Sequence, residues 1–340
     1  MKSFVLKILI FSFPAIVYCL IIVISDPYNY FNVVRIMNND LKSLNFFRSE
    51  KTIVLGNMLF KIHNFNRNPC PNIILGDSRA GHLSKDTIYK LTGINYFNFG
   101  IPGGSYKTII HLFWFAESKI KLKNVYITIG LHNYVKNWGK DLYCEAMAMD
   151  KNIYPYFTAP LLVNEAFYHL KIFLNNKIYT PLFSQKNKKK GNGKYKIIWR
   201  KVISQKDWDE KNAFRKNNFI RWHTHPDDIL DSLTKIAEYC KKNDIKLVFI
   251  MVPYQEDFYK TVKVAKLEEE MLRYRRDFCN LGEVFDFDYE NEITQDRSLF
   301  RDLFHANDSV YSIMCEEIFG GKKGIARHYL PASAIKQGIN

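Results

Sequence analysis

The sequence has no closely spaced cysteines. Its six cysteines stand at positions 19, 70, 144, 240, 279 and 315, and no two of them form a Cys-x-x-Cys pair. Metal-binding fingers and thioredoxin-like redox sites use such pairs, so the spacing supports neither class. If the body of the protein is exported, a disulfide is possible, but the sequence does not reveal its connectivity.

A metal site has one other candidate in the sequence. His223 and His225 form a His-x-His pair, with Asp227 and Asp228 close behind. Pro226 followed by two acids is also how a helix begins, because carboxylates are favoured near the positive end of the helix dipole. We favour the helix start and expect neither a metal nor a cofactor.

Acidic residues are scarce relative to basic ones. The 340 residues include 34 Asp and Glu against 49 Lys and Arg, which gives a net charge of +15. Residues 151 to 222 contain 16 basic and 4 acidic residues, so most of the excess lies there. Such a region attracts polyanionic glycans, anionic lipid headgroups or nucleic acid, or it is an ordinary solvated surface. Charge alone does not choose among these.

Long apolar runs are absent with one exception. Residues 4 to 25 are apolar apart from Lys7 and small polar side chains, and about 20 such residues are enough to cross a bilayer as a helix. The run lacks the amphipathic face of a buried core helix and the small-residue exit of a cleaved signal peptide. Lys2 and Lys7 on its N-terminal side predict a cytoplasmic N-terminus. We therefore expect a single-pass protein of the cell membrane whose body is periplasmic or extracellular.

Short runs rich in β-branched residues alternate with helical patterns along the rest of the chain. This alternation predicts an α/β fold with a mainly parallel sheet and helices on both faces, a flavodoxin-like three-layer α/β/α sandwich. We expect strands at residues 72–75, 94–99, 125–129, 246–252 and 284–287, and helices at 84–91, 106–119, 227–241, 256–275 and 309–319.

The spacing of these segments also predicts the domain organisation. More than a hundred residues separate the third strand from the fourth, too many for one crossover connection. We expect an insertion, partly helical and partly basic, at about residues 136–221 within a domain that spans residues 71–320. An anchor at residues 1–25 and a juxtamembrane connection at 26–70 precede that domain, and a C-terminal tail at 321–340 follows it.

Four loops carry the residues whose side chains could take part in a reaction. In an open α/β sheet, ligands bind at the carboxyl ends of the strands, so the loops that follow strands matter most. Ser78 follows the first strand, a glycine-rich turn from Asn98 to Ser105 follows the second, and His132 and Asn133 follow the third. Asp302-Leu303-Phe304-His305 precedes the last helix. A serine, an imidazole and a carboxylate supply the nucleophile, base and orienting acid of acyl-transfer chemistry.

In this order the four loops resemble the sequence blocks of the SGNH (GDSL-type) hydrolase superfamily, over roughly residues 70 to 320 without the insertion. The matching motifs are Gly-Asp-Ser, an Asn-x-Gly-x-x-Gly turn, a degenerate Gly-x-Asn-Asp block and Asp-x-x-His. The resemblance implies that Ser78 is the nucleophile, His305 the general base and Asp302 the group that orients the imidazole. It also implies an oxyanion hole formed by the backbone N–H groups of Ser78 and Gly103.

The third block departs from the family pattern. Where the family has its oxyanion asparagine, this chain has His132, and Asn133 comes one residue later. Either the Asn133 side chain completes the oxyanion hole, or His132 donates instead, or only backbone N–H groups contribute. For Asp77 and Asn98 we expect a supporting role, in which their side chains hold the two turns through backbone hydrogen bonds.

The Asp-Ser-Arg ending of the first block and the N-terminal anchor resemble the membrane-anchored cell-envelope branch of the superfamily, which includes alginate O-acetylation and D-alanyl-lipoteichoic acid proteins. The resemblance implies a serine esterase or O-acetyltransferase that acts on a cell-envelope polysaccharide. A transferase would need a separate multi-pass membrane protein to supply its acyl groups.

Two other interpretations remain open at this point. One is a catalytically silent SGNH-fold protein that binds glycans or assists envelope assembly. The other is nucleic-acid binding through the lysine-rich stretch at residues 186–194, which requires that stretch to lie in the cytoplasm. An exported body predicts no nucleic-acid partner.

Overall fold

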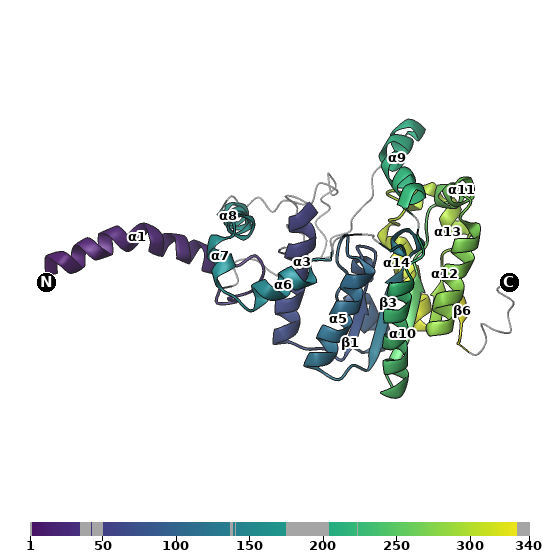
Figure 1. Cartoon of the computed structure of the whole chain (residues 1–340), viewed down its shortest axis with the longest axis horizontal. Coiled ribbons are helices and arrows are strands. Elements are labelled where there is room, and N and C mark those ends of the chain that lie inside the picture. Colours follow the sequence, from purple (N-terminus) through teal and green to yellow (C-terminus); the bar gives the residue numbers. More distant parts are fainter. Residues whose placement is uncertain are drawn as a thin grey trace. The chain divides into compact units, whose positions relative to one another are not determined.

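The computed structural model describes residues 2–34, 42, 50–136, 139, 141–174, 204–222 and 224–331. The chain divides into two compact units (Figure 1). The first unit consists of Met1–Asn68 together with Leu142–Lys194, and the second consists of Pro69–Asp141 together with Tyr195–Asn340. The lysine-rich stretch at residues 186–194 lies outside the described residues.

Helices make up the described part of the first unit. Helix α1 packs on α7 and α8, and α3 packs on α6. The N-terminal segment and the first part of the predicted insertion therefore belong to one unit. Within the described residues, no helix is both long and apolar enough to cross a membrane. The helices of this unit are α1 (Lys2–Ser25), α3 (Glu50–Arg67), α6 (Tyr143–Asp150), α7 (Tyr154–Thr158) and α8 (Pro160–Leu174).

A six-stranded, mostly parallel sheet forms the centre of the second unit. Its strand order is β2-β1-β3-β4-β5-β6, and only β6 runs antiparallel to its neighbour. All five strands expected from the sequence are present, so the α/β prediction is confirmed. The edge strand β6 was not expected, because it falls in the predicted tail. The strands are β1 (Asn72–Leu75), β2 (Phe97–Asn98), β3 (Asn124–Ile129), β4 (Lys246–Met251), β5 (Glu283–Asp286) and β6 (Arg327–Tyr329).

Helices cover both faces of this sheet. Helices α5 (Tyr106–Lys119), α10 (Asp227–Lys242) and α12 (Glu268–Leu281) lie side by side along one face (Figure 1). Helices α4 (Lys85–Thr92) and α14 (Asp308–Gly320) pack against each other on the opposite face.

Aromatic contacts show which strand residues point to which face. Phe249 of β4 contacts Phe278 of α12 with ring centroids 5.0 Å apart, whereas Tyr126 of β3 contacts Phe319 of α14 at 4.7 Å. Tyr126 pairs with Val248, the neighbour of Phe249, and successive strand residues point to opposite faces. The core therefore has two layers, one on each side of the sheet.

The remaining helices of the second unit are short or lie outside the two layers. One helix expected over residues 256–275 is broken into two, because Lys266 adopts a left-handed conformation with a φ of 55°. These helices are η1 (Ala80–His82), η2 (Leu131–Asn133), α9 (Gln205–Trp222), α11 (Asp257–Val264), α13 (Glu292–Gln295) and η3 (Arg297–Leu299).

Glycine is required where β1 ends. Gly76 has a φ of 152°, a conformation that L-residues with a side chain rarely adopt. A Cβ atom at this position would also overlap the Thr128 side chain on the neighbouring strand β3. The close approach of β1 and β3 thus depends on the missing side chain of Gly76.

We predict that Gly76→Ala destabilises the protein strongly. Backbone strain and overpacking each cost about 1 to 3 kcal/mol, so the expected loss of unfolding free energy is about 2 to 6 kcal/mol. Gly81→Ala is the matched control, because a Cβ there meets no atom within 4 Å, and we expect a change below about 1 kcal/mol. Urea unfolding of both variants measures the difference. Equal stability of the two would contradict the role assigned to Gly76.

Candidate functional site

Ser78 stands at the carboxyl end of β1, in the turn that connects this strand to η1. Ser78 is partly exposed, whereas Asp77 and Arg79 on either side are buried. The Asp77 carboxylate accepts a hydrogen bond of 2.9 Å from the backbone N–H of Arg79, which closes the turn around Ser78. The turn therefore leaves Ser78 partly exposed and holds its two neighbours inside.

A closed loop presents His305. Phe300 and Ala306 form an isolated antiparallel bridge, and the backbone N–H of Arg301 donates to the carbonyl of His305 at 2.8 Å. Leu303 joins this loop to two other elements. Its carbonyl accepts from the N–H of Gln255 at 3.1 Å, and its own N–H donates to Asn212 on α9 at 3.2 Å.

Ser78, His305 and Asp302 form a continuous series of hydrogen bonds. Oγ of Ser78 lies 2.8 Å from Nε2 of His305, and Nδ1 of His305 lies 2.8 Å from Oδ1 of Asp302. Ionised Asp302 can only accept, so Nδ1 donates to it and Nε2 is left to accept the Ser78 proton. The structure thus brings together the three residues that the sequence predicted to act in concert, across 227 positions of the chain.

Asp302 is itself fixed by its own loop. Its side chain is 1 % exposed, and Oδ1 also accepts the backbone N–H groups of Phe304 and His305 at 3.0 Å each. A carboxylate bound by two backbone donors cannot rotate freely. It therefore sets the orientation of the imidazole plane of His305.

The surroundings of His305 keep its imidazole neutral at pH 7. Burial lowers the pKa of His305 below its usual 6.5, and the Asp302 carboxylate opposes this effect without overcoming it. Arg301 and His82 lower the pKa further. A neutral imidazole with its proton on Nδ1 is the form that can remove a proton from a hydroxyl.

Asp77 is paired with Arg79 and takes no part in the hydrogen bonds to His305. The guanidinium donates to the carboxylate from Nε at 3.1 Å and from Nη2 at 2.9 Å. Although burial raises the pKa of Asp77, Arg79 lowers it to about 2, with a smaller contribution from His132. Asp77 is therefore an ionised, fully engaged acceptor beneath the Ser78 turn.

The glycine-rich turn after β2 lies beside the turn that carries Ser78. The backbone N–H of Ile101 donates to the carbonyl of Gly76 at 3.0 Å, so the pairing of β1 with β2 continues past both strand ends. Asn98 holds the two turns together, because its Nδ2 donates to the carbonyl of Ala80 at 2.7 Å and its Oδ1 accepts from the N–H of Gly100 at 2.8 Å.

Gly103 follows in a left-handed conformation with a φ of 71°. Neither its backbone N–H nor that of Ser78 donates a hydrogen bond to the described residues. Both groups stand at the same edge of the sheet, because the loops after β1 and β2 run side by side. Two backbone donors are thus present at the edge of the sheet where Ser78 stands.

The two residues of the third predicted block have different partners. Nδ2 of Asn133 donates to Oδ2 of Asp77 at 3.1 Å. His132 lies flat against Phe304, with ring centroids 4.4 Å apart, and its Nδ1 is 2.7 Å from Oη of Tyr254. All the predicted site residues therefore gather at one edge of the sheet, but Asn133 binds Asp77 there.

Tyr254 and Phe304 are site residues to which the sequence assigned no role. Tyr254 lies in the loop after β4 and is fully buried. The rule that ligands bind at strand ends applies to this loop as well as to the other loops. Tyr254 could have been found by that rule, whereas the stacking of Phe304 on His132 required the structure.

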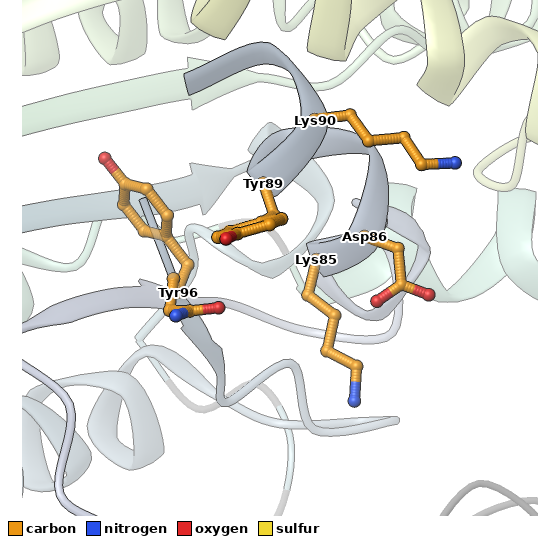
Figure 2. A pocket seen from close by; sticks show the side chains of 6 residues that line it. Lys85, Asp86, Tyr89, Lys90 and Tyr96 are labelled. Carbon is orange, nitrogen blue, oxygen red and sulfur yellow. The ribbon is translucent and has the colours of Figure 1, made fainter. Parts of the chain in front are cut away.

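The pocket in Figure 2 lies elsewhere on the second unit. It has a volume of about 470 Å³ and is lined by residues of α4 and by the two residues before β2. The amino-terminal end of β2 is opposite to the carboxyl ends where Ser78 stands. The lining residues are Lys85, Asp86, Tyr89, Lys90, Asn95 and Tyr96.

The described residues contain no cluster of three or more His, Cys, Asp or Glu side chains suited to a metal ion. His223 of the His-x-His pair lies outside the described residues, and Asp227 begins α10. The six cysteines are all free.

No protein-family model matches the chain. No curated protein matches it at a significant level either.

We predict that the imidazole of His305 titrates below pH 6.5. Replacement of Asp302 by Asn removes the carboxylate that raises the pKa of His305, so the midpoint should fall further. NMR titration of histidine-labelled protein measures both midpoints, with His305→Gln identifying the resonance. A midpoint above 6.5, or a rise in Asp302→Asn, would show that the environment of His305 is not as described.

Proposed function

We propose that this protein is a serine acyl esterase or O-acyltransferase. The observation that supports the proposal is the pair of 2.8 Å hydrogen bonds that join Ser78 to His305 and His305 to Asp302. A hydroxyl bonded to a neutral imidazole, which is in turn oriented by a buried carboxylate, is the arrangement that activates serine for attack on a carbonyl carbon.

The first half of the reaction forms an acyl-serine. Oγ of Ser78 attacks the ester carbonyl carbon while its proton passes to Nε2 of His305, and Asp302 stabilises the imidazolium. The backbone N–H groups of Ser78 and Gly103 donate to the negative oxygen of the tetrahedral intermediate. When this intermediate collapses, the ester C–O bond breaks and His305 returns the proton to the departing alcohol.

The second half transfers the acyl group from Ser78. Water or a sugar hydroxyl loses its proton to Nε2 of His305 and attacks the acyl-serine carbonyl. Collapse of the second tetrahedral intermediate releases Ser78, which recovers its proton from His305. Water as the acceptor makes the protein an esterase, and a sugar hydroxyl makes it a transferase.

The fold and the order of the site residues support membership of the SGNH hydrolase superfamily as part of this proposal. The order β2-β1-β3-β4-β5 is that of flavodoxin-like sheets, in which ligands bind where the strand order reverses. That point lies between β1 and β3, and Ser78 and His132 follow these two strands. Within the superfamily, we propose the cell-envelope branch and an acetyl ester of an envelope polysaccharide as substrate.

We propose further that the N-terminal helix anchors the protein in the cell membrane. Helix α1 has 24 residues, and Phe4, Ile10 and Phe11 are 68, 65 and 90 % exposed. At 1.5 Å per residue its length is about 36 Å, comparable to the ~30 Å hydrocarbon core of a bilayer. Several side chains before Ile10 lie outside the described residues, so the single crossing stays a prediction.

A transferase on the outer side of the membrane needs an acyl donor. Neither the site nor the single proposed anchor offers a path for an activated acyl group across the bilayer. A multi-pass membrane protein that delivers acyl groups is therefore the partner we propose for the transferase form, with the envelope glycan as acceptor. Nucleic acid has no role in this proposal.

We predict that a fluorophosphonate probe labels Ser78 and that Ser78→Ala abolishes hydrolysis of a small acetyl ester. The probe reports an activated serine, and loss of Oγ removes the nucleophile. Ser84→Ala is the matched control, because Ser84 caps α4 through the N–H of Thr87 and its loss costs only about 1 kcal/mol of stability. Peptide mass mapping and ester turnover are the two measurements. If Ser78 stays unlabelled in the folded wild type, a catalytically silent glycan-binding protein becomes the better interpretation.

We predict that alkaline phosphatase fused after residue 340 is active in cells, because this enzyme folds only outside the cytoplasm. The control removes residues 4–25 from the same fusion, and activity should then be lost. Activity of the shortened fusion equal to that of the full one would contradict the proposed anchor. An inactive full-length fusion would place the body of the protein in the cytoplasm. Nucleic acid would then again be a possible partner of the lysine-rich stretch.

A further inference from the structure

Helix α9 is the last helix of the predicted insertion, and it binds the loop that carries Asp302 and His305. Residues Leu142–Lys194 of the insertion belong to the first unit, whereas α9 belongs to the second. The helix packs on α11, which follows β4 (Figure 1). One part of the insertion is therefore built into the unit that contains the candidate site.

Two neighbouring residues of α9 bind the two peptide groups on either side of Asp302. Nζ of Lys211 donates to the carbonyl of Arg301 at 2.7 Å, and this carbonyl belongs to the peptide that precedes Asp302. Oδ1 of Asn212 accepts the backbone N–H of Leu303 at 3.2 Å, and this N–H belongs to the peptide that follows Asp302. The helix thus holds the backbone of Asp302 from both directions.

The next peptide group along the loop is fixed as well. Its carbonyl, that of Leu303, accepts the N–H of Gln255 at 3.1 Å. Its N–H, that of Phe304, donates to Oδ1 of Asp302 at 3.0 Å. The same oxygen accepts from Nδ1 of His305. The position of Oδ1 therefore depends on two consecutive peptide groups, and α9 holds the first of them.

The amide of Asn212 has a defined orientation. Its Nδ2 donates to the carbonyl of Trp208, one turn earlier in α9, at 2.8 Å. Oδ1 is then the atom that meets the N–H of Leu303, and only an oxygen of the amide can accept it. Asn212 and Leu303 are both fully buried. Loss of the amide would leave that N–H without an acceptor inside the protein, which is unfavourable.

Trp208 joins α9 to the second segment that holds the loop. Its Nε1 donates to Oδ2 of Asp257, the first residue of α11, at 2.9 Å. The backbone N–H of Asp257 donates to Oε1 of Gln255 at 2.9 Å. Asn212 and Gln255 thus bind Leu303 from two segments that are themselves connected. This connection makes the support of the loop rigid.

We propose that Asn212 is a positioning residue that sets the orientation of Asp302 toward His305, so that α9 of the insertion takes part in arranging the site. This role rests on the proposed acyl-transfer function and deepens it, because it assigns a task to a helix outside the four motif loops. Asn212 acts through the backbone of Leu303 and not on the reacting atoms.

The hydrogen bond between His305 and Asp302 can be measured without reference to catalysis. In ¹H NMR spectra of the full chain, the Nδ1–H of a histidine bound to a carboxylate resonates at low field, and His305→Gln identifies the signal. We expect Asn212→Leu to shift this signal to higher field, in the same direction as Asp302→Asn. An unchanged signal in folded Asn212→Leu overturns the inference.

Kinetics test the consequence with a matched control. Asn212→Leu should lower kcat for an acetyl ester about 10-fold to 100-fold with little change in KM, because a misplaced base slows proton transfer without weakening substrate binding. Asn57→Leu is the control. Asn57 of α3 is also buried, and its Nδ2 donates to the carbonyl of Ile53, one turn earlier, at 2.7 Å. Equal losses of kcat in the two variants overturn the inference, because they would reflect only a lost buried amide.

A double variant tests whether Asn212 acts through Asp302. Once Asp302→Asn has removed the carboxylate, Asn212→Leu should lower kcat by less than about twofold further. Losses that add in full overturn the positioning role, since Asn212 would then contribute independently of Asp302.

Lys211→Ala is a second variant that leaves the core intact, because residue 211 is exposed. Loss of one of the two contacts between α9 and the backbone of Asp302 should lower kcat about twofold to tenfold. Lys206→Ala is the control, since Lys206 lies in the same helix and its Nζ pairs with Glu210 at 3.9 Å. Equal kcat values for the two lysine variants overturn the role of α9, and this comparison decides the matter if Asn212→Leu does not fold.

Failure of the proposed function is distinguishable from failure of the positioning role. If the fluorophosphonate probe does not label Ser78 while the His305 signal moves in Asn212→Leu, the proposed function fails and the positioning of Asp302 by Asn212 stands. If Ser78 is labelled and the signal does not move, the function stands and the positioning role is overturned.

Discussion

The buried ion pair between Asp77 and Arg79 is the interaction on which the site depends. Both residues are nearly inaccessible to water, and the guanidinium donates to both carboxylate oxygens at 2.9 to 3.1 Å. Burying two charges costs free energy that only a close, well-aligned pair offsets. Because the pair flanks Ser78, its alignment also fixes the turn that presents the hydroxyl.

Loops from three strands are arranged around this ion pair. Asn133, after β3, donates to Asp77, and the guanidinium of Arg79 lies 5.3 Å from the ring centroid of Tyr254, after β4. Gly130 lies against the same guanidinium, and a Cβ there would overlap both Arg79 and the Tyr254 hydroxyl. The extended backbone at Gly130 would tolerate any residue. A side chain there would nevertheless push the Arg79 guanidinium and the Tyr254 hydroxyl apart.

Local sequence pattern predicted the parts of the fold that are buried on both sides. The strands beginning at Asn72 and Lys246 consist of short apolar runs between loops. A buried strand is the structure that such runs favour. The edge strand Arg327–Tyr329 has exposed or partly exposed residues and no apolar alternation, so it gave no signal. The association of Leu142–Lys194 with the N-terminal segment depends on contacts between distant residues, which periodicity does not encode.

The candidate site was predictable to the extent that its residues form sequence motifs in a known order. Ser78, Asp302 and His305 met that condition, and the structure joins them. The choice between His132 and Asn133 did not, because it depends on which partner each side chain meets. That partner is the Asp77 carboxylate for Asn133 and the Tyr254 hydroxyl for His132, and both follow from three-dimensional packing.

The arginine after Ser78 has a consequence for charge in the proposed reaction. An oxyanion forming beside Ser78 would be repelled by an unpaired carboxylate at Asp77. Arg79 neutralises Asp77 directly, and Arg301 lies 3.6 Å from Oδ2 of Asp302. Each carboxylate near the reacting groups therefore has its own guanidinium, so negative charge can develop at the substrate carbonyl with little repulsion from either acid.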